Sequence, residues 1–198
     1  MFYMLKSLVD DTRTDKNTIH SYLDLYEELL SKKKNTAKNV LEVGIGDGNA
    51  TTGNGGSIKL WYDYFPNASV HALDIQDSNK IWDELKNNDR IQLYTSTNAY
   101  DENKFKEHFL DKNIKCDFML DDGPHSLESM IYFIRLYSQI MTEDGILIIE
   151  DVQKWEWIDI LTNTVPESLK QYVKTYDLRA NKGRYDDIVF TIDKSSAL

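Results

Sequence analysis

The chain has 198 residues, of which 41% are hydrophobic and 28% charged, and its formal net charge is −10. These proportions are typical of one compact soluble domain with a sizeable core. A negative chain repels nucleic-acid phosphates and anionic lipid headgroups, so we expect neither a nucleic acid nor a membrane as partner. The one lysine run, Lys32 to Lys34, is expected to be the solvated end of a helix.

The single cysteine, Cys116, rules out an internal disulfide and favours a reducing compartment, so we expect a cytoplasmic protein. Cys116 lies in the apolar run KCDFML, where a buried thiol is expected rather than a nucleophile. No stretch approaches the roughly 18 apolar residues of a membrane span. The opening residues lack the basic start of a signal peptide.

Helical and strand patterns alternate along the chain. Apolar residues at helical spacing predict a first helix over residues 18–30, with Ile19 on its buried side. Strands are predicted at 39–44, 69–75, 90–96, 116–122 and 145–151, and the helices between them at 57–65, 77–88, 101–110 and 126–141. Ser126 is the expected cap of the last helix. Two final strands, 171–178 and 186–192, are close enough to form an antiparallel pair.

This alternation predicts the fold class. Strands that are apolar throughout are typical of parallel sheets covered by helices on both faces. We therefore expect one doubly wound α/β domain over residues 1–198, with a mostly parallel Rossmann-like sheet and the antiparallel pair at its C-terminal end. Residues 1–36 form a helical segment ahead of the first strand.

Glycines are concentrated in residues 39–61, NVLEVGIGDGNATTGNGGSIKLW, where the first strand passes into a helix. Gly44 and Gly46 match the start of the dinucleotide-binding pattern Gly-x-Gly-x-x-Gly, but Asn49 stands at its third glycine. Such glycines indicate that a ligand approaches the backbone closely.

Acids near these glycines favour a cationic ligand. Glu42 and Asp47 are poorly placed beside a pyrophosphate, which needs a positive helix N-terminus. They suit S-adenosylmethionine, whose sulfonium is positive and whose ribose needs a carboxylate. Asp74, at the end of the second strand, is the candidate for that carboxylate.

Two successive strands each end in a pair of acids. The pairs are Asp121–Asp122 and Glu150–Asp151. The carboxyl ends of neighbouring parallel strands meet at one edge, about 4.8 Å apart, so these carboxylates should converge. A divalent cation would neutralise them, and an all-oxygen ligand set suits Mg²⁺ or Mn²⁺. His125, three residues after Asp122, is a candidate general base.

With the motifs at 40–75 and in DFMLDDGPH and GILIIEDV, the chain resembles the class I S-adenosylmethionine-dependent methyltransferases. More narrowly, it resembles the metal-dependent sugar O-methyltransferases typified by the mycinamicin and macrocin enzymes. The resemblance runs from residue 14 to the end of the second acidic strand. In that family an Asp-Asp-Gly-Ser-His motif supplies a metal ligand and the catalytic histidine. Here Pro124 stands in place of the serine.

The resemblance implies a role for each matching residue. Asp122, Glu150 and Asp151 would hold Mg²⁺ or Mn²⁺, and His125, acting with Asp122, would deprotonate the acceptor hydroxyl. Ser57 would face the methionine end of the cofactor. The implied cofactor-binding set is Glu42, Gly44, Gly46, Ser57, Asp74, Ser96, Asn98 and Asp121.

Two segments beside the acids have two interpretations each. Residues 14–26, TDKNTIHSYLDLY, are either a lid or only the start of an amphipathic helix. As a lid, the segment would bring three side chains near the site: Lys16, His20 and Tyr22. Trp155 and Trp157 either stack on a sugar ring or pack against the sheet.

The predicted function is S-adenosylmethionine- and Mg²⁺-dependent O-methylation of a sugar hydroxyl, on a free sugar, a nucleotide sugar or a glycoside. Three alternatives stay open. A catechol or other vicinal-diol O-methyltransferase would use the same metal. A nicotinamide oxidoreductase shares the fold but leaves the acids unexplained, and a non-catalytic binder of S-adenosylmethionine needs no histidine among them. Relatives of this kind often self-associate, so a homo-oligomer is compatible with the sequence.

Overall fold

The computed structural model describes residues 4–46 and 54–197. Seven strands are found there: β1 Asn39–Val43, β2 Ser69–Leu73, β3 Ile91–Tyr94, β4 Cys116–Asp121, β5 Met141–Ile149, β6 Val173–Asp177 and β7 Ile188–Asp193. They form one sheet in the order β3-β2-β1-β4-β5-β7-β6. Strands β1 to β5 are parallel, and β7 runs antiparallel to β5 and β6. The mostly parallel sheet with a C-terminal antiparallel pair is therefore confirmed.

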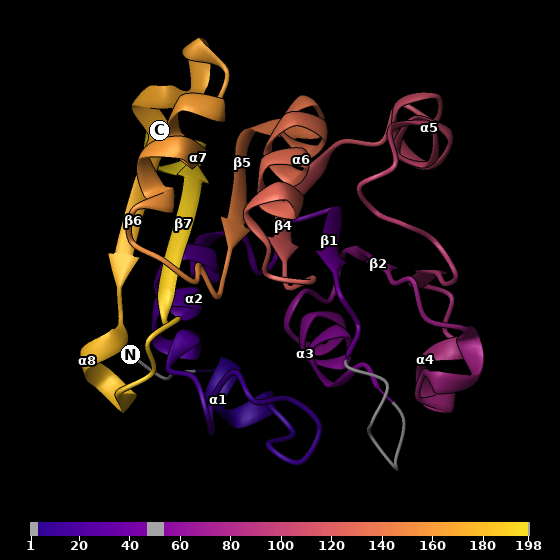
Figure 1. Ribbon diagram of the computed structural model, residues 1–198. Coiled ribbons are helices and arrows are strands. Elements are labelled where there is room, and N and C mark those ends of the chain that lie inside the picture. The colour runs from indigo at the N-terminus through magenta and orange to yellow at the C-terminus, as the bar shows by residue number, and fades with distance from the viewer. Residues whose placement is uncertain (1–3, 47–53, 198) are drawn as a thin grey trace.

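Helices cover both faces of this sheet (Figure 1). They are α1 Leu5–Leu8, α2 Tyr22–Leu30, α3 Gly56–Tyr64, α4 Asp83–Lys86, α5 Glu102–Phe105, α6 Leu127–Tyr137, α7 Trp157–Thr164 and α8 Arg179–Lys182. Short 3₁₀ segments lie at Ser31–Lys33, Ser78–Lys80, Ser138–Ile140, Glu167–Tyr172 and Lys194–Ala197, and a π-helical turn at Lys106–Leu110. Ser126 caps α6 as predicted, since its hydroxyl accepts a hydrogen bond from the Ser129 backbone N–H.

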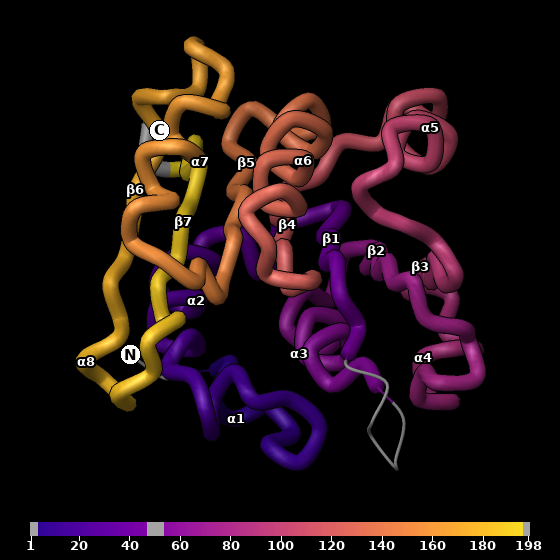
Figure 2. Tube along the Cα trace, viewed as in Figure 1, coloured from indigo at the N-terminus to yellow at the C-terminus, as the bar shows by residue number. Residues whose placement is uncertain are grey.

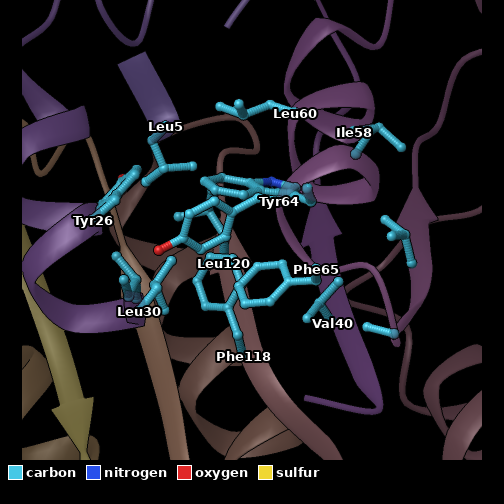
Figure 3. Packing of buried hydrophobic residues seen from close by; sticks show 14 of the residues in the cluster. Leu5, Tyr26, Leu30, Val40, Ile58, Leu60, Tyr64, Phe65, Phe118 and Leu120 are labelled. Carbon is cyan, nitrogen blue, oxygen red and sulfur yellow. The ribbon is translucent and has the colours of Figure 1, made fainter. Parts of the chain in front are cut away.

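Two hydrophobic clusters form the core, one on each face of the sheet. Phe118 and Leu120 of β4 belong to the cluster under α1, α2 and α3, whereas Met119 points into the cluster under α6 and α7. In the first cluster, Tyr64 and Phe65 at the end of α3 lie between the N-terminal helices and β4 (Figure 3). The alternation of side chains along each strand thus decides which helices meet which residues.

The segment before α2 lies beside α8, which connects β6 to β7. Figure 2 shows the N-terminal segment next to α8, near the C-terminal end of the colour range. The Asn181 side chain donates to Ser21 Oγ at 3.1 Å, and Lys182 Nζ donates to the Thr18 carbonyl oxygen at 3.0 Å. These bonds hold the segment before α2 against the carboxyl edge of the sheet.

Four sequence predictions need correction. The helix predicted at 77–88 is broken, because Ile81 forms a parallel bridge with Asn54 and ends the 3₁₀ turn before α4. The first helix begins only at Tyr22, and Ile19 is 48% exposed. The helix predicted at 101–110 changes to a π-helical turn after α5.

The fourth correction concerns the lysine run. Lys33 is buried rather than solvated, and its ammonium lies 2.7 Å from Asp144 Oδ2. Cys116 is fully buried, as predicted. None of the helices within the described ranges has both the length and the apolar character needed to cross a bilayer.

Candidate active site

Strand register brings three acids together on one face of the sheet. Asp121 pairs with Ile149 across β4 and β5, so the next residues, Asp122 and Glu150, are also neighbours. Glu42 of β1 lies on the same face, further into the sheet, as the alternation along the strands requires. This is the face covered by the N-terminal helices.

A buried lysine lies between these acids. The Lys16 side chain is fully buried, and its Nζ is 2.7 Å from Asp122 Oδ2 and 4.0 Å from Glu42 Oε1. The same ammonium donates to Glu150 Oε1. Burial opposes the positive charge, but the three carboxylates outweigh it and raise the pKa of Lys16 above its ordinary value. Lys16 therefore carries its charge inside the protein.

The two innermost acids have a donor on every oxygen. Glu150 accepts from Lys16 on Oε1 and from the Tyr26 hydroxyl on Oε2. Glu42 accepts from Ser57 Oγ at 2.6 Å and from the Trp61 ring N–H. Burial raises the pKa of Glu42 to about 7, with Lys16 acting in the opposite direction. Glu42, Glu150 and Lys16 are called the buried acid group below.

Asp122, His125 and Asp151 form a second group, the open acid group, in which each aspartate keeps one oxygen directed at the histidine. Asp122 Oδ2 bonds to Lys16, and its Oδ1 lies 3.8 Å from His125 Nε2. Asp151 Oδ1 accepts from the Tyr22 hydroxyl, and its Oδ2 lies 3.7 Å from the same nitrogen. One ligand atom from each of the three residues lies within 4.8 Å of the others.

Unusual backbone conformations aim two members of the open acid group. His125 and Asp151 have φ values of 52° and 55°, in the left-handed region that non-glycine residues rarely occupy. Such conformations cost about 1–3 kcal/mol each and are concentrated at functional sites. His125 directly precedes the cap of α6, and Asp151 stands two residues after the end of β5, so both occupy points where the chain turns out of the sheet.

Two cavities adjoin at Asp122 and Gly123. The first, of about 480 Å³, contains the open acid group and is closed on one side by the segment before α2. Its other lining residues include Ile19, Ile45, Gly46, Asn54 and Ser57. The second, of about 330 Å³, has a more apolar wall that includes Val43, Gly44, Leu73, Asp74, Ile75, Asn98 and Tyr100. An elongated ligand with one apolar and one polar end would fit across both.

The chain itself requires glycine at position 44. Gly44 has a φ of 92°, and a Cβ atom there would lie 1.9 Å from the Asp122 carbonyl oxygen. The ends of β1 and β4 can approach this closely only without a side chain. Asp74 fixes the same loop, because its Oδ2 accepts from the Ile45 N–H at 2.7 Å. Asp47 and Asn49, two positions singled out in the sequence, lie outside the described residues.

The residues predicted to bind the cofactor are distributed unevenly. Asp74 and Asn98 line the second cavity, and Gly46 and Ser57 the first. Ser96 is exposed and lines neither of these two cavities. Asp121 lies on the opposite face of the sheet from Asp122. There it accepts a hydrogen bond from the Tyr100 hydroxyl at 2.5 Å, and burial raises its pKa to about 7.

Residues before α2 and before β7 form a network that sequence reasoning missed in part. Lys16, His20 and Tyr22 do lie beside the acids, but no acid partner was expected for His20. Its Nδ1 is 2.6 Å from Asp187 Oδ1, while Asp186 is paired with Arg184 at 3.1 Å. Asp186 and Asp187, directly before the last strand, were the feature of the sequence that could have indicated this network. His20 and Asp187 are paired with each other, but Asp186 Oδ1 and Arg184 Nε are buried without a hydrogen-bond partner among the described residues. The ligand atoms of His20, Asp151, Asp186 and Asp187 lie close enough together to form a second candidate cation group beside the first.

The two tryptophans after β5 differ. Trp157 packs against the hydrophobic cluster under α6 and α7, which is the packing interpretation. Trp155 is 46% exposed, and the Arg179 guanidinium lies 5.6 Å from its ring centroid. Neither tryptophan lines the two cavities described above.

Comparison with known proteins links this geometry to a chemistry. No family model matches the sequence. The chain is 26% identical over 145 residues to the 8-demethyl-8-alpha-L-rhamnosyl tetracenomycin-C 2'-O-methyltransferase of Streptomyces olivaceus, a match that covers 73% of this chain and 36% of that protein. It is 24% identical over 140 residues to the mycinamicin VI 2''-O-methyltransferase of Micromonospora griseorubida, covering 70% and 33%. The chain thus spans about a third of the length of these curated relatives.

A solved structure agrees in fold. The MycE methyltransferase from the mycinamycin biosynthetic pathway, in complex with Mg, SAH and mycinamycin VI, matches with a TM-score of 0.73 and 18% identity, over 96% of this chain and 53% of that chain. The chain therefore shares the Rossmann-like fold of this methyltransferase. The sequence relatives are sugar O-methyltransferases, so the resemblance noted from the motifs is confirmed.

Proposed function

We propose that this chain transfers a methyl group from S-adenosylmethionine to a sugar hydroxyl, with the help of a divalent cation. The observation that carries the proposal is the cavity that holds Asp122, His125 and Asp151 next to the glycine loop, with a second cavity adjoining it. The sugar is proposed because the relatives are named for O-methylation of glycosides. A cytoplasmic location, favoured by the lone Cys116, remains a prediction.

The donor set of the open acid group fits a divalent cation. Asp122 Oδ1 and Asp151 Oδ2 are carboxylate oxygens, the ligand type preferred by Mg²⁺ and Mn²⁺. Their side chains are 25% and 11% exposed, so a cation in the cavity would keep some of its water. Glu150, the third ligand implied by the resemblance, lies outside this group of ligand atoms.

The cofactor fits the two adjoining cavities. Ile75 and Leu73 give the second cavity an apolar wall for a flat base, and Asp74 stands at the same place for a ribose hydroxyl. Gly46 and Ser57 would then border the methionine end, close to the open acid group. This direction presents the methyl group to the acceptor side of the first cavity.

The mechanism follows from where the protein's own groups lie. When bound, the cofactor supplies the methyl group and the cation supplies positive charge that lowers the pKa of the acceptor hydroxyl. His125 Nε2, directed at the space between the two aspartates, would accept the hydroxyl proton while the acceptor oxygen takes the methyl group and S-adenosylhomocysteine is released. The Tyr22 hydroxyl holds one oxygen of Asp151, which fixes the other toward the cavity. The remaining contribution is positioning of the acceptor.

The test is transfer of labelled methyl from S-adenosylmethionine to a panel of acceptors. The panel contains deoxysugar glycosides, the matching aglycones without sugar, nucleotide sugars and a catechol. We expect label in a sugar-bearing acceptor and none in the aglycone that lacks it. If the catechol alone is labelled, the proposed acceptor is a non-sugar vicinal diol instead of a sugar. Label in no acceptor, from a chain that binds the cofactor, would contradict catalysis.

A further inference from the structure

Lys16 occupies a position where a cation is expected. Its ammonium has no exposed surface and contacts Asp122 and Glu150, two of the three acids that the resemblance assigns to a metal. Asp122 and Glu150 are neighbours across β4 and β5, so the single positive charge between them offsets half of their combined negative charge. A Mg²⁺ ion needs oxygens at about 2.0–2.1 Å, and it could not share this space with the ammonium.

The hydrogen bonds divide the acids into two kinds. Both oxygens of Glu150 accept from buried donors, Lys16 and Tyr26. Asp122 and Asp151 each give one oxygen to a buried donor and direct the other at His125. Of these three acids, the two aspartates therefore keep an oxygen for a ligand in the cavity, and Glu150 does not.

We propose that Lys16 serves as a permanent internal cation, with Glu150 as its counter-ion, so that a divalent ion binds Asp122 and Asp151 without Glu150. This inference rests on the proposed function. It assigns the consecutive residues Glu150 and Asp151 to different cations. It also explains why the segment before α2 is fixed to the sheet edge, because Lys16 cannot leave without exposing two buried carboxylates.

The test removes the pair as a unit and measures cation binding rather than activity. Lys16→Met together with Glu150→Gln deletes both charges, keeps similar volumes and leaves an amide oxygen for Tyr26. Replacing a buried ion pair in this way is often tolerated, whereas Lys16→Met alone would leave carboxylates buried without a partner. Mn²⁺ is the probe, and the free ion is measured by electron paramagnetic resonance on the full chain. Thermal unfolding verifies that each variant is folded.

We expect the double variant to bind Mn²⁺ within about threefold of the unmodified chain, and Asp151→Asn to bind it roughly tenfold more weakly or worse. The control is the pair Lys33 and Asp144, in which a buried ammonium lies 2.7 Å from a half-exposed carboxylate. Lys33→Met with Asp144→Asn should leave Mn²⁺ binding unchanged.

Two outcomes would overturn the inference, and they are distinguishable. If the double variant loses as much Mn²⁺ affinity as Asp151→Asn, Glu150 is a ligand, and the proposed function stands with the original three acids. If the unmodified chain binds no Mn²⁺, the cation is removed from the proposed function and from this inference together. Glu150→Gln alone provides a further check. It should lower the unfolding temperature and leave the Mn²⁺ affinity within about threefold of that of the unmodified chain.

Discussion

The buried and the open acid groups lie at the same sheet edge but have opposite surroundings. In the buried group, every oxygen of Glu42 and Glu150 accepts a hydrogen bond from a buried donor. In the open group, Asp122 is partly exposed and Asp151 is buried at the cavity wall, and each directs an oxygen at His125. The difference shows that acids which look equivalent in sequence can have separate tasks. Glu42 and Glu150 of the buried acid group fix the carboxyl edge of the sheet, and we propose that Asp122 and Asp151 of the open acid group bind a ligand.

The largest effect is expected from His125→Ala. Loss of a general base typically slows turnover by about 10²–10⁴-fold, whereas no cofactor contact is assigned to this side chain. We therefore expect kcat to fall by that factor, with the Kd for S-adenosylhomocysteine unchanged. Methyl transfer and calorimetric titration measure the two quantities.

The same variant distinguishes a base from a ligand. His125 Nε2 belongs to the set of atoms that could hold a cation. If the histidine acts only as a base, His125→Ala binds Mn²⁺ like the unmodified chain. A clear loss of Mn²⁺ affinity would make His125 a ligand and would contradict its assignment as base.

Asp151→Asn should have the next largest effect. It keeps an oxygen for the Tyr22 hydroxyl but halves the anionic charge of the open group's two carboxylates. We expect kcat to fall by roughly a hundredfold, because cation charge stabilisation is worth several kcal/mol. Cofactor affinity should hardly change. Equal losses in turnover and in cofactor affinity would argue against a cation role.

Asp121→Asn tests the buried side through pH. Burial raises the pKa of Asp121 from 3.8 to about 7, so the folded protein retains its proton between these values while the unfolded chain has lost it. The stability that this raised pKa provides is present below pH 4 and is lost as the pH rises through 7. The asparagine variant should therefore gain about 2–4 kcal/mol relative to the unmodified chain between pH 4 and pH 8.

Urea unfolding at pH 4, 6 and 8 measures this difference, in which the other titrating groups cancel. The Tyr100 hydroxyl keeps an oxygen acceptor in the variant, so the bond at 2.5 Å in the unmodified chain is not the source of the change. A difference that is flat with pH would mean that Asp121 is ionised in the folded protein throughout.

The smallest effect is expected at the cavity rim. Ile19 lines the first cavity and is 48% exposed there, so Ile19→Ala should raise the acceptor KM by about threefold to tenfold through lost apolar contact. Trp155→Ala is the comparison, because this equally exposed ring lies outside both cavities. Steady-state kinetics on one acceptor should show no change for Trp155→Ala. If Trp155→Ala raises the acceptor KM and Ile19→Ala does not, Trp155 is the side chain that stacks on the sugar ring.

The sheet and its acidic edge could be predicted because they rest on local patterns. Apolar strand runs fix a parallel sheet, and acids that directly follow such runs must meet at the carboxyl edge. The same reasoning placed Asp122, His125 and Asp151 together, as the structure does. It also gave the antiparallel pair at the C-terminal end.

Long-range contacts could not be predicted in the same way. Lys16 lies 134 positions from Glu150, and nothing in TDKNTIHSY marks a lysine as fully buried. The alternation of side chains along a strand predicts that Glu150 and Asp151 point in different directions. It does not predict which helices cover each face of the sheet. The need for glycine at position 44 was likewise only partly predicted. The sequence indicated a ligand close to the backbone, whereas the structure shows that the Asp122 carbonyl oxygen also leaves no room for a side chain.

The most direct test of the account is methyl transfer to a deoxysugar glycoside with and without EDTA, followed by addition of Mg²⁺. We expect EDTA to abolish transfer, excess Mg²⁺ to restore it, and the Asp151→Asn variant to gain nothing from added Mg²⁺. Transfer that proceeds unchanged in EDTA would contradict the central claim, because the open acid group would then have no cation to hold.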